Sequence, residues 1–287
     1  MNATSRERAM VANTHLPLSP RVLLEIWEAM SSLLIDFPQV LDRMSRQLPL
    51  AERLLREAHR LAPRHGVERI SIPQAGTLLG PENLRQAVVR WLLLAPLHRN
   101  PLWDRVQQEA LALGETTRTL ALLLMRQSPW WRSSRFPQLD PDFYFMAGLF
   151  RECGQWVLWQ QVPGYRLPFR HSPGDGSAIL LDETTRFGTN HARLGSLFAK
   201  SLGLPAHLCR AIRNHHHPLP DWTADQPAGH LKELFLAAIL RLGDRVHSAE
   251  PLDTVHLKTP CRLFQLEQKE LSALLDEARH RLPSSSP

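Results

Sequence analysis

The chain has 287 residues, of which 43% are hydrophobic and 22% charged, so it is long enough for one large or two modest domains around a substantial core. The basic residues behind its formal net charge of +6 are mostly arginines mixed with glutamates, as in "AERLLREAHRLAPRHGVER", a pattern typical of a solvated helix face and not of a nucleic-acid site. Three scattered cysteines without a Cys-x-x-Cys pair indicate neither a zinc ribbon nor a disulfide framework, and the polar start and the lack of an apolar run of about 20 residues predict a cytoplasmic protein without a membrane span.

Helices are predicted throughout the first half, because leucine dominates the apolar residues and these recur at three-and-four spacing. Residues 1–15 are expected to form a flexible N-terminal arm. Pro49 divides one helical stretch and Gly80 another, since proline suits a first helical turn and glycine ends helices. The helical stretches of this half cover residues 20–34, 37–61, 70–94 and 102–127.

The second half begins after a proline-rich segment, residues 128–141, which has no apolar period and is the best candidate for a seam between subdomains. Residues 162–183 are predicted to be a loop. Since no strand alternation stands out anywhere, we expect an all-α protein. The helices predicted in this half cover residues 140–161, 191–203, 205–216, 229–249 and 266–282.

Three adjacent histidines, His215, His216 and His217, end a predicted helix just before Pro218. Imidazole is the commonest metal ligand in proteins, but successive helical residues point about 100° apart, so at most two of the three can bind one ion. Pro218 turns His217 out of helical geometry. Histidines at the end of a helix are also favoured by the helix dipole and bond its last carbonyls. Taken alone, the run is therefore explained by capping as well as by metal binding.

The residues around this run occur in an order that resembles the HDOD domain, a non-catalytic relative of the HD-type metal phosphohydrolases. The resemblance rests on "ETTRFGTNHARLGSLFAKSLGLP" and "CRAIRNHHHP", and "ISIPQAGTLLG" and "FMAGLFRECGQWVL" are similar to earlier segments of the family. The residues that match the family motif are Glu183, Phe187, Gly188, His191, Gly195, Gly203, Leu204, Pro205, His215 and His216.

The resemblance implies a multi-helix HD-like bundle with an N-terminal helical subdomain. On this basis residues 16–250 form an HDOD-like domain, divided into an N-terminal helical part (16–127) and an HD-like part (140–250). Residues 251–282 are expected to form a C-terminal helical extension, and residues 283–287 a disordered tail.

The metal site implied by the resemblance is incomplete. In catalytic HD enzymes a lone histidine and a His-Asp pair supply half of the ligands, and the similar positions here are Arg105, Arg151 and Glu152. Glutamate can ligate a metal, whereas arginine cannot, because its guanidinium has no lone pair to offer. The other half remains as a candidate metal or ligand site: His191, His215, His216 and Asp244. This incomplete set favours a protein that is not an enzyme and has no cofactor, or binds one divalent metal ion.

Two arginines at ligand positions suggest a further hypothesis. Arg105 and Arg151 would supply the charge that metals supply in the enzymes, pairing with Glu152 and Asp244 in a neutral, metal-free core. Alternatively, the two guanidiniums bind a phosphate-bearing ligand, for which their geometry is suited, or they reach solvent.

For function, the resemblance implies a regulatory domain in signal transduction that acts by binding protein partners. Two alternatives stay open, a degenerate metal-dependent phosphohydrolase and a sensor that binds a nucleotide or cyclic dinucleotide at the residual site. Trp130 and Trp131, in the proline-rich segment, are candidate contacts for a partner, or else they fix that segment to the core.

Overall fold

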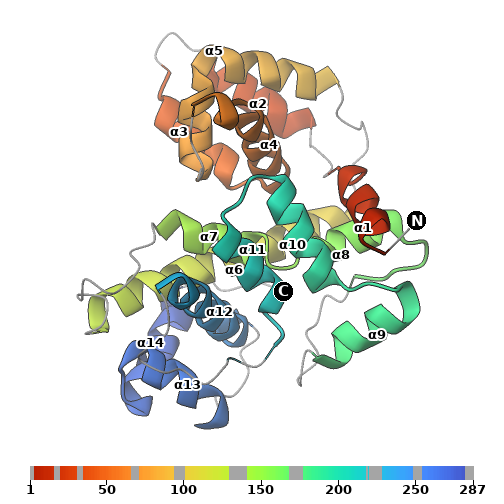
Figure 1. The fold of residues 1–287 in the computed structure, drawn as a ribbon. Coiled ribbons are helices and arrows are strands. Elements are labelled where there is room, and N and C mark those ends of the chain that lie inside the picture. Colours follow the sequence, from red (N-terminus) through yellow and green to blue (C-terminus); the bar gives the residue numbers. More distant parts are fainter. Residues whose placement is uncertain are drawn as a thin grey trace.

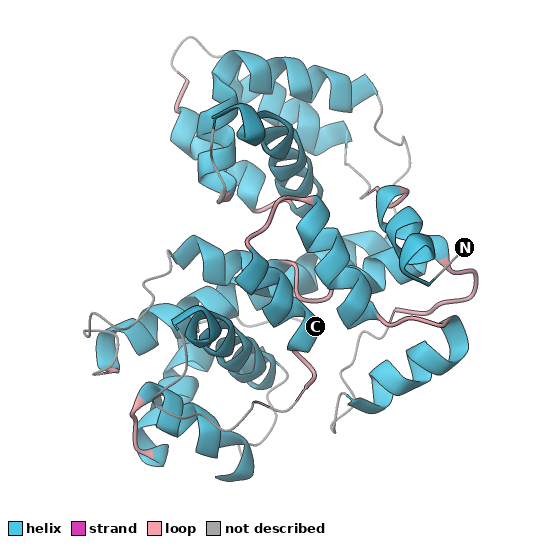
Figure 2. Cartoon of the chain, in the orientation of Figure 1, coloured by secondary structure: helices cyan, strands magenta, loops and turns pink. Residues whose placement is uncertain are grey.

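The chain is entirely helical in the part that the structure, a computed structural model, describes. The described residues form fourteen helices and no strand, which confirms the all-α prediction (Figure 2). They comprise residues 3–15, 20–30, 35–65, 71–93, 101–128, 141–167, 177–217, 219, 228–247 and 254–281.

Four helices form a bundle at one end of the molecule, which we call the N-terminal bundle (Figure 1). Each turns an apolar face inward, where Ile26, Leu54 and Leu84 are fully buried. The predicted break at Gly80 is confirmed: its φ of 73° and ψ of 163° are not helical, and they bend the last of these helices. The four helices are α2 (Pro20–Met30), α3 (Phe37–Ser45), α4 (Leu48–His65) and α5 (Ile72–Leu93).

The central bundle contains the helices that carry the candidate site: α6 (Pro101–Gln127), α7 (Pro141–Leu149), α8 (Cys153–Gln161), α10 (His191–Ser201), α11 (Ala206–Asn214) and α12 (Ala228–His247). The structure differs here from the division expected at residue 127, because α6 packs along α7 and α12 and belongs to this bundle. Gly148 explains the close contact of α7 with α6, since a Cβ at this position would lie 2.5 Å from the Leu113 carbonyl oxygen.

Two helices lie where the sequence was expected to form an arm and a loop. The arm contains α1 (Ala3–Ala12), which packs on α10 and α8. Its Glu7 is 2% exposed, accepts a hydrogen bond from Thr189 at 2.6 Å and pairs with Arg193 at 2.8 Å. The predicted loop contains α9 (Ser177–Phe187), whose buried face includes Glu183. Both helices are therefore held by buried carboxylates, which are not visible in an apolar periodicity.

The C-terminal helices complete the core of the central bundle. They are α13 (Thr254–Phe264) and α14 (Gln268–Arg281), and α14 packs on both α6 and α12. Leu271, Leu274 and Leu275 are at most 1% exposed, so this extension is an integral layer of the fold. None of the helices that the structure describes combines the length and apolar character needed to cross a membrane. The pair Trp130-Trp131 and the tail 283–287 lie outside the described residues.

Candidate metal site

The turn between α7 and α8 carries Arg151 and Glu152 into the centre of the molecule. Gly154 allows α8 to approach α10 closely, because a Cβ there would lie 1.8 Å from the His191 carbonyl oxygen. Glu152 is the N-cap residue of α8, yet its side chain makes no capping hydrogen bond. Its carboxylate instead faces the histidines.

Each histidine of the site stands at the end of a helix. His191 is the first residue of α10, which is capped by the Asn190 side chain accepting a hydrogen bond from the Arg193 amide at 3.0 Å. His215 is the C-cap of α11, and His216 follows it. Helix ends therefore aim these side chains at one point, which the interior of a helix could not do with two consecutive residues.

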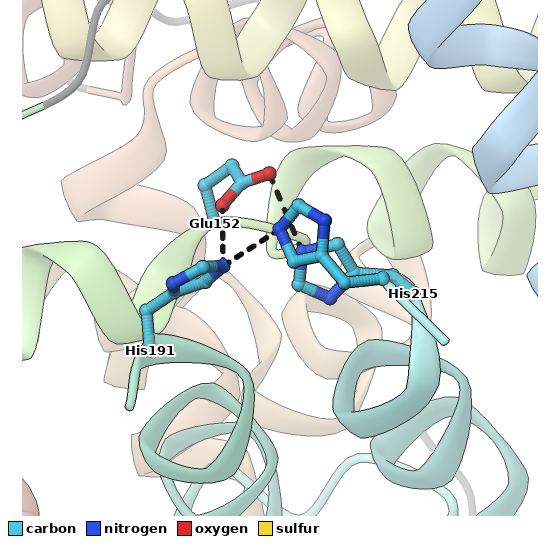
Figure 3. Close-up of side chains that lie close together, drawn as sticks. Glu152, His191 and His215 are labelled. Carbon is cyan, nitrogen blue, oxygen red and sulfur yellow. Dashed lines mark hydrogen bonds and ion pairs between the residues drawn. The ribbon is translucent and has the colours of Figure 1, made fainter. Parts of the chain in front are cut away.

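Four side chains converge at this point. The Nε2 atom of His191 lies 2.9 Å from Nε2 of His216 and 3.5 Å from Oε2 of Glu152. Nε2 of His215 lies 3.4 Å from the other carboxylate oxygen, Oε1. Figure 3 shows the side chains of Glu152, His191 and His215 pointing toward one another. One potential ligand atom from each of the four residues lies within 4.8 Å of the others.

Hydrogen bonds at the far side of the rings set the histidine tautomers. Nδ1 of His191 lies 2.7 Å from Glu183 Oε2, and Nδ1 of His215 lies 2.5 Å from the Ile212 carbonyl oxygen. Because a carboxylate and a carbonyl only accept, both Nδ1 atoms carry the proton and donate. A neutral ring then has a lone pair on Nε2, so lone pairs of His191 and His215 face the oxygens of Glu152.

This donor set fits one divalent metal ion. Nitrogen ligands about 2.0 Å from a tetrahedral zinc ion lie about 3.3 Å from one another, close to the three separations in the group. Nε2 of His215 and Oε1 of Glu152 are buried and have no hydrogen-bond partner, as expected of atoms that face a cation. The hydrogen bond from His191 to Glu183 is the outer support that metal-binding histidines typically have.

Arg151 places a positive charge next to Glu152. Its side chain is 2% exposed, and its Nη1 donates to Asp244 Oδ1 at 2.5 Å. Its Nε atom lies 3.3 Å from Glu152 Oε1. One guanidinium thus bridges two carboxylates, the pairing that one of the sequence hypotheses expected of Arg151. The other had assigned Asp244 to the metal ligands.

The charges of the site follow from burial and from this bridge. Burial alone would lower the pKa of Arg151, but the carboxylates of Asp244 and Glu152 raise it above its usual value. Burial would raise the pKa of Glu152, but the charge of Arg151, with His215 and His191, holds it well below its usual value. Burial lowers the pKa of both His215 and His216, and their mutual proximity lowers that of His216 further. At neutral pH Glu152 is therefore ionised and both of these histidines are neutral.

The group of converging side chains thus differs in one member from the metal site that the family resemblance implied. Glu152, and not Asp244, joins the three histidines. Arg105 lies on α6 with 53% of its side chain exposed and pairs with Glu109 one turn further along. His217 is exposed, and its carbonyl oxygen accepts a hydrogen bond from Arg241 at 2.5 Å.

Two polar residues that the sequence analysis missed support the site. Gln155 donates to Glu152 Oε2 at 2.8 Å, and Tyr165 donates to Glu183 Oε1 at 2.7 Å. Gln155 lies three residues after Glu152, the spacing of neighbours on one helix face, and this spacing could have indicated it. No local signal connects Tyr165 with Glu183, because both residues were expected within one long loop.

The residues of the family motif shape the surroundings of the histidines. Glu183 orients His191, and Phe187 packs on Tyr165 with ring centroids 5.6 Å apart. Gly188 and Gly203 have φ of 73° and 75°, a conformation that favours glycine at the ends of α9 and α10. Gly195 faces Gly154 in the close contact between α10 and α8, and Leu204 and Pro205 lead into α11.

A small cavity borders Glu152. Its volume is about 50 Å³, and Glu109, Gln155, Trp156 and His247 contribute to its walls. Sites for small organic ligands typically have about 300–1,000 Å³, so this cavity has room for water and not for a nucleotide.

Comparison with known proteins places this arrangement in a family. The HDOD domain matches residues 16–218. The solved structure of the MmoQ response regulator from Methylococcus capsulatus str. Bath is similar, with 22% identity and a TM-score of 0.63 over 92% of this chain and 98% of that one. No match was found among curated proteins.

Two further solved structures are matched at lower similarity. A putative phosphohydrolase from Shewanella amazonensis SB2B has 18% identity and a TM-score of 0.42, covering 92% of this chain and 90% of that one. An HDOD domain protein from Geobacter sulfurreducens has 17% identity and a TM-score of 0.38, covering 98% of both chains.

The chain is an HD-like helical domain. It shares its all-α fold with the response regulator, and its helix ends direct the histidines to one point. The chain belongs to the HDOD family, whose match extends over most of its length.

Proposed function

We propose that this chain is a regulatory HDOD domain that acts in signal transduction by binding protein partners and does not hydrolyse phosphoesters. Its family and its similarity to a response regulator support a role in signalling. The cytoplasmic location expected from the sequence is consistent with such a role and remains a prediction.

The observation that carries the proposal is the guanidinium of Arg151. Two-metal hydrolysis requires a second ion that carries or activates a reacting oxygen. Asp244, the carboxylate available for such an ion, is bonded to Arg151 at 2.5 Å, and the same fixed charge lies 3.3 Å from Glu152. Arginine has no lone pair and no open coordination position, so it neutralises the carboxylates without providing a reactive group.

The test combines a chemical assay with partner capture. Bis(4-nitrophenyl) phosphate is incubated with the purified protein and added manganese, and we expect no turnover above that of the buffer. Affinity capture from the native cell, followed by binding measurements with the purified candidate, should give a partner that binds directly. Turnover that is abolished in the His191→Ala variant would overturn the proposal in favour of a degenerate phosphohydrolase.

A second role is supported by the converging lone pairs of the histidines and Glu152. We propose that these four residues bind one divalent ion. Its positive charge would hold the ends of α8, α10 and α11 together, so that the ion stabilises the fold. Titration with zinc in a calorimeter tests this, and His215→Ala should lower the affinity at least tenfold, since it removes one of four donors. Equal affinity in the variant would show that the ion binds elsewhere.

A further inference from the structure

A larger cavity of about 340 Å³ lies where the N-terminal bundle meets the central bundle. It shares no wall residue with the histidine group, and α3, α5, α6 and α7 all contribute to it. Most of its wall is apolar, with Leu41, Ile72, Phe145 and Met146 buried behind it. A volume of this size is within the range of about 300–1,000 Å³ typical of small-molecule sites. At roughly 30 Å³ per water-sized group, it holds a ligand of about ten to twelve non-hydrogen atoms.

Two carboxylates at the rim of this cavity share one cation. Arg46 pairs with Asp42 at 3.1 Å, one turn away on the same helix, and with Glu115 of α6 at 3.5 Å. A single guanidinium therefore serves both acidic groups of the wall and links the two bundles across the cavity.

Arg118 is the second cation of the wall. It balances the total charge of the wall but takes no part in the ion pairs of Arg46. Its Nε atom is buried and has no hydrogen-bond partner, and no ion pair joins Arg118 to a carboxylate in the described part of the chain. Burying a donor without a partner is unfavourable, so its presence requires an explanation. Glu115, three residues earlier on α6, is the nearest carboxylate in sequence, but it faces Arg46.

We propose that this cavity binds a small amphipathic carboxylate. The apolar body of the ligand, of about eight non-hydrogen atoms, would lie against Ile72, Phe145 and Met146, and its carboxylate would accept hydrogen bonds from Arg118. A guanidinium is suited to this contact, because its parallel N–H groups match the two oxygens of a carboxylate. A ligand in this position touches both bundles and thereby stabilises their relative arrangement.

The test uses 3-phenylpropionate, which has eleven non-hydrogen atoms, and its neutral amide, 3-phenylpropanamide, as the matched probe of about the same shape. Calorimetric titration of the full chain should show the acid binding at least tenfold more tightly than the amide, because a hydrogen bond between two charged groups is stronger than one to a neutral amide. Arg118→Gln should remove this preference while binding of the amide is unchanged. Arg126→Gln, an exposed arginine two turns further along α6, serves as the control and should leave the preference intact.

Glu115→Gln provides a second variant that does not depend on Arg118. Removing a negative charge from the wall should tighten binding of 3-phenylpropionate several-fold and leave the amide unaffected. Equal affinity for acid and amide, no binding of either probe, or loss of binding in Arg126→Gln would each overturn the proposal. Binding of a blocked acidic tripeptide but not of 3-phenylpropionate would also overturn it, and would assign the cavity to a protein segment instead.

Discussion

Arg151 determines the chemistry of the candidate site at the scale of single residues. A metal ion in this position could exchange ligands and hold water, whereas a guanidinium offers only donors in a fixed plane. It contacts both Asp244 and Glu152, and its charge helps to keep Glu152 ionised inside the protein. The remaining donors then fit one ion at most, on the side of the three histidines.

Replacing this arginine should therefore destabilise the fold strongly. Arg151→Met keeps the apolar stem but removes the buried cation that bridges Asp244 and Glu152, and breaking a buried pair costs about 3–5 kcal/mol. Urea unfolding measures the loss. Arg105→Met is the control, because its exposed pair with Glu109 is worth about 0.2–1 kcal/mol. A loss below 1 kcal/mol in Arg151→Met would contradict the central role of the bridge.

Stability should also fall as the pH drops below 6.5. Burial holds the pKa of His215 and of His216 below the value of 6.5 for the free side chain, so only the unfolded chain gains these protons in this range. Each histidine then lowers the free energy of unfolding by about 1.4 kcal/mol per pH unit. Urea unfolding between pH 7.5 and 5 with a chelator present tests this.

The matched variants separate this effect from general acid sensitivity. His216→Gln should reduce the slope of stability against pH by about 1.4 kcal/mol per unit. Arg213→Gln, which replaces an exposed side chain of α11, should leave the slope unchanged. An unaltered slope in His216→Gln would mean that this histidine is not held neutral.

The sequence could predict which residue types form the site, but not every partner. His191, His215 and His216 follow from the family motif and meet in the structure. Asp244 was expected either with them or paired with Arg151, 93 positions earlier, and the structure shows the pair, while Glu152 joins the histidines. Competition between a histidine group and an arginine for one carboxylate depends on three-dimensional distance, which spacing along the chain does not encode.

At the scale of elements, the contact between α8 and α10 fixes the geometry of the histidine group. Gly154 and Gly195 face each other there and allow backbone atoms to touch. The contact sets the distance from Glu152, just before α8, to His191, at the start of α10. Small residues at this crossing therefore position the site without taking part in its chemistry.

A methyl group at this crossing should separate the two helices. In Gly154→Ala the Cβ would lie 1.8 Å from the His191 carbonyl oxygen, so backbone must move, and we expect a loss of at least 3 kcal/mol, above the about 1–3 kcal/mol typical of overpacked cores. Gly243→Ala is the control of opposite sign. Its Cβ would meet nothing closer than Thr117 Oγ1 at 3.4 Å, and alanine inside α12 should stabilise by about 0.5–1 kcal/mol. Thermal unfolding compares the stability of both variants with that of the unsubstituted chain. Unchanged stability in Gly154→Ala would contradict the prediction.

The helices that periodicity did not predict are held by polar contacts. In α9 the buried Glu183 binds the backbone amide and ring of His191, both at 2.7 Å. In α1 the buried Glu7 pairs with Arg193. Apolar spacing predicts helices whose stability comes from a hydrophobic face, and it misses those fixed by one long-range carboxylate.

At the scale of the whole molecule, the structural domain extends beyond the residues that match the family. The match ends at residue 218, but Asp244, the hydrogen-bond partner of Arg151, lies on α12. Helix α12 also packs on α6, α7 and α11, and α14 packs on α6 and α12. The helices after the match therefore contribute to the same core as those within it.

A chain that ends at residue 219 should consequently fail to fold. It loses five side chains of α12 that are at most 1% exposed, Phe235, Leu236, Ala238, Ile239 and Leu240, as well as the buried leucines of α14. Removing one large buried side chain typically costs about 2–5 kcal/mol, so the sum exceeds the total stability of about 5–15 kcal/mol of a natural domain. Circular dichroism during heating should show no cooperative transition for this fragment, while a chain that ends at Arg281 should melt as the full chain does. A fragment ending at residue 219 that melts cooperatively near the temperature of the full chain would show that the core closes without α12.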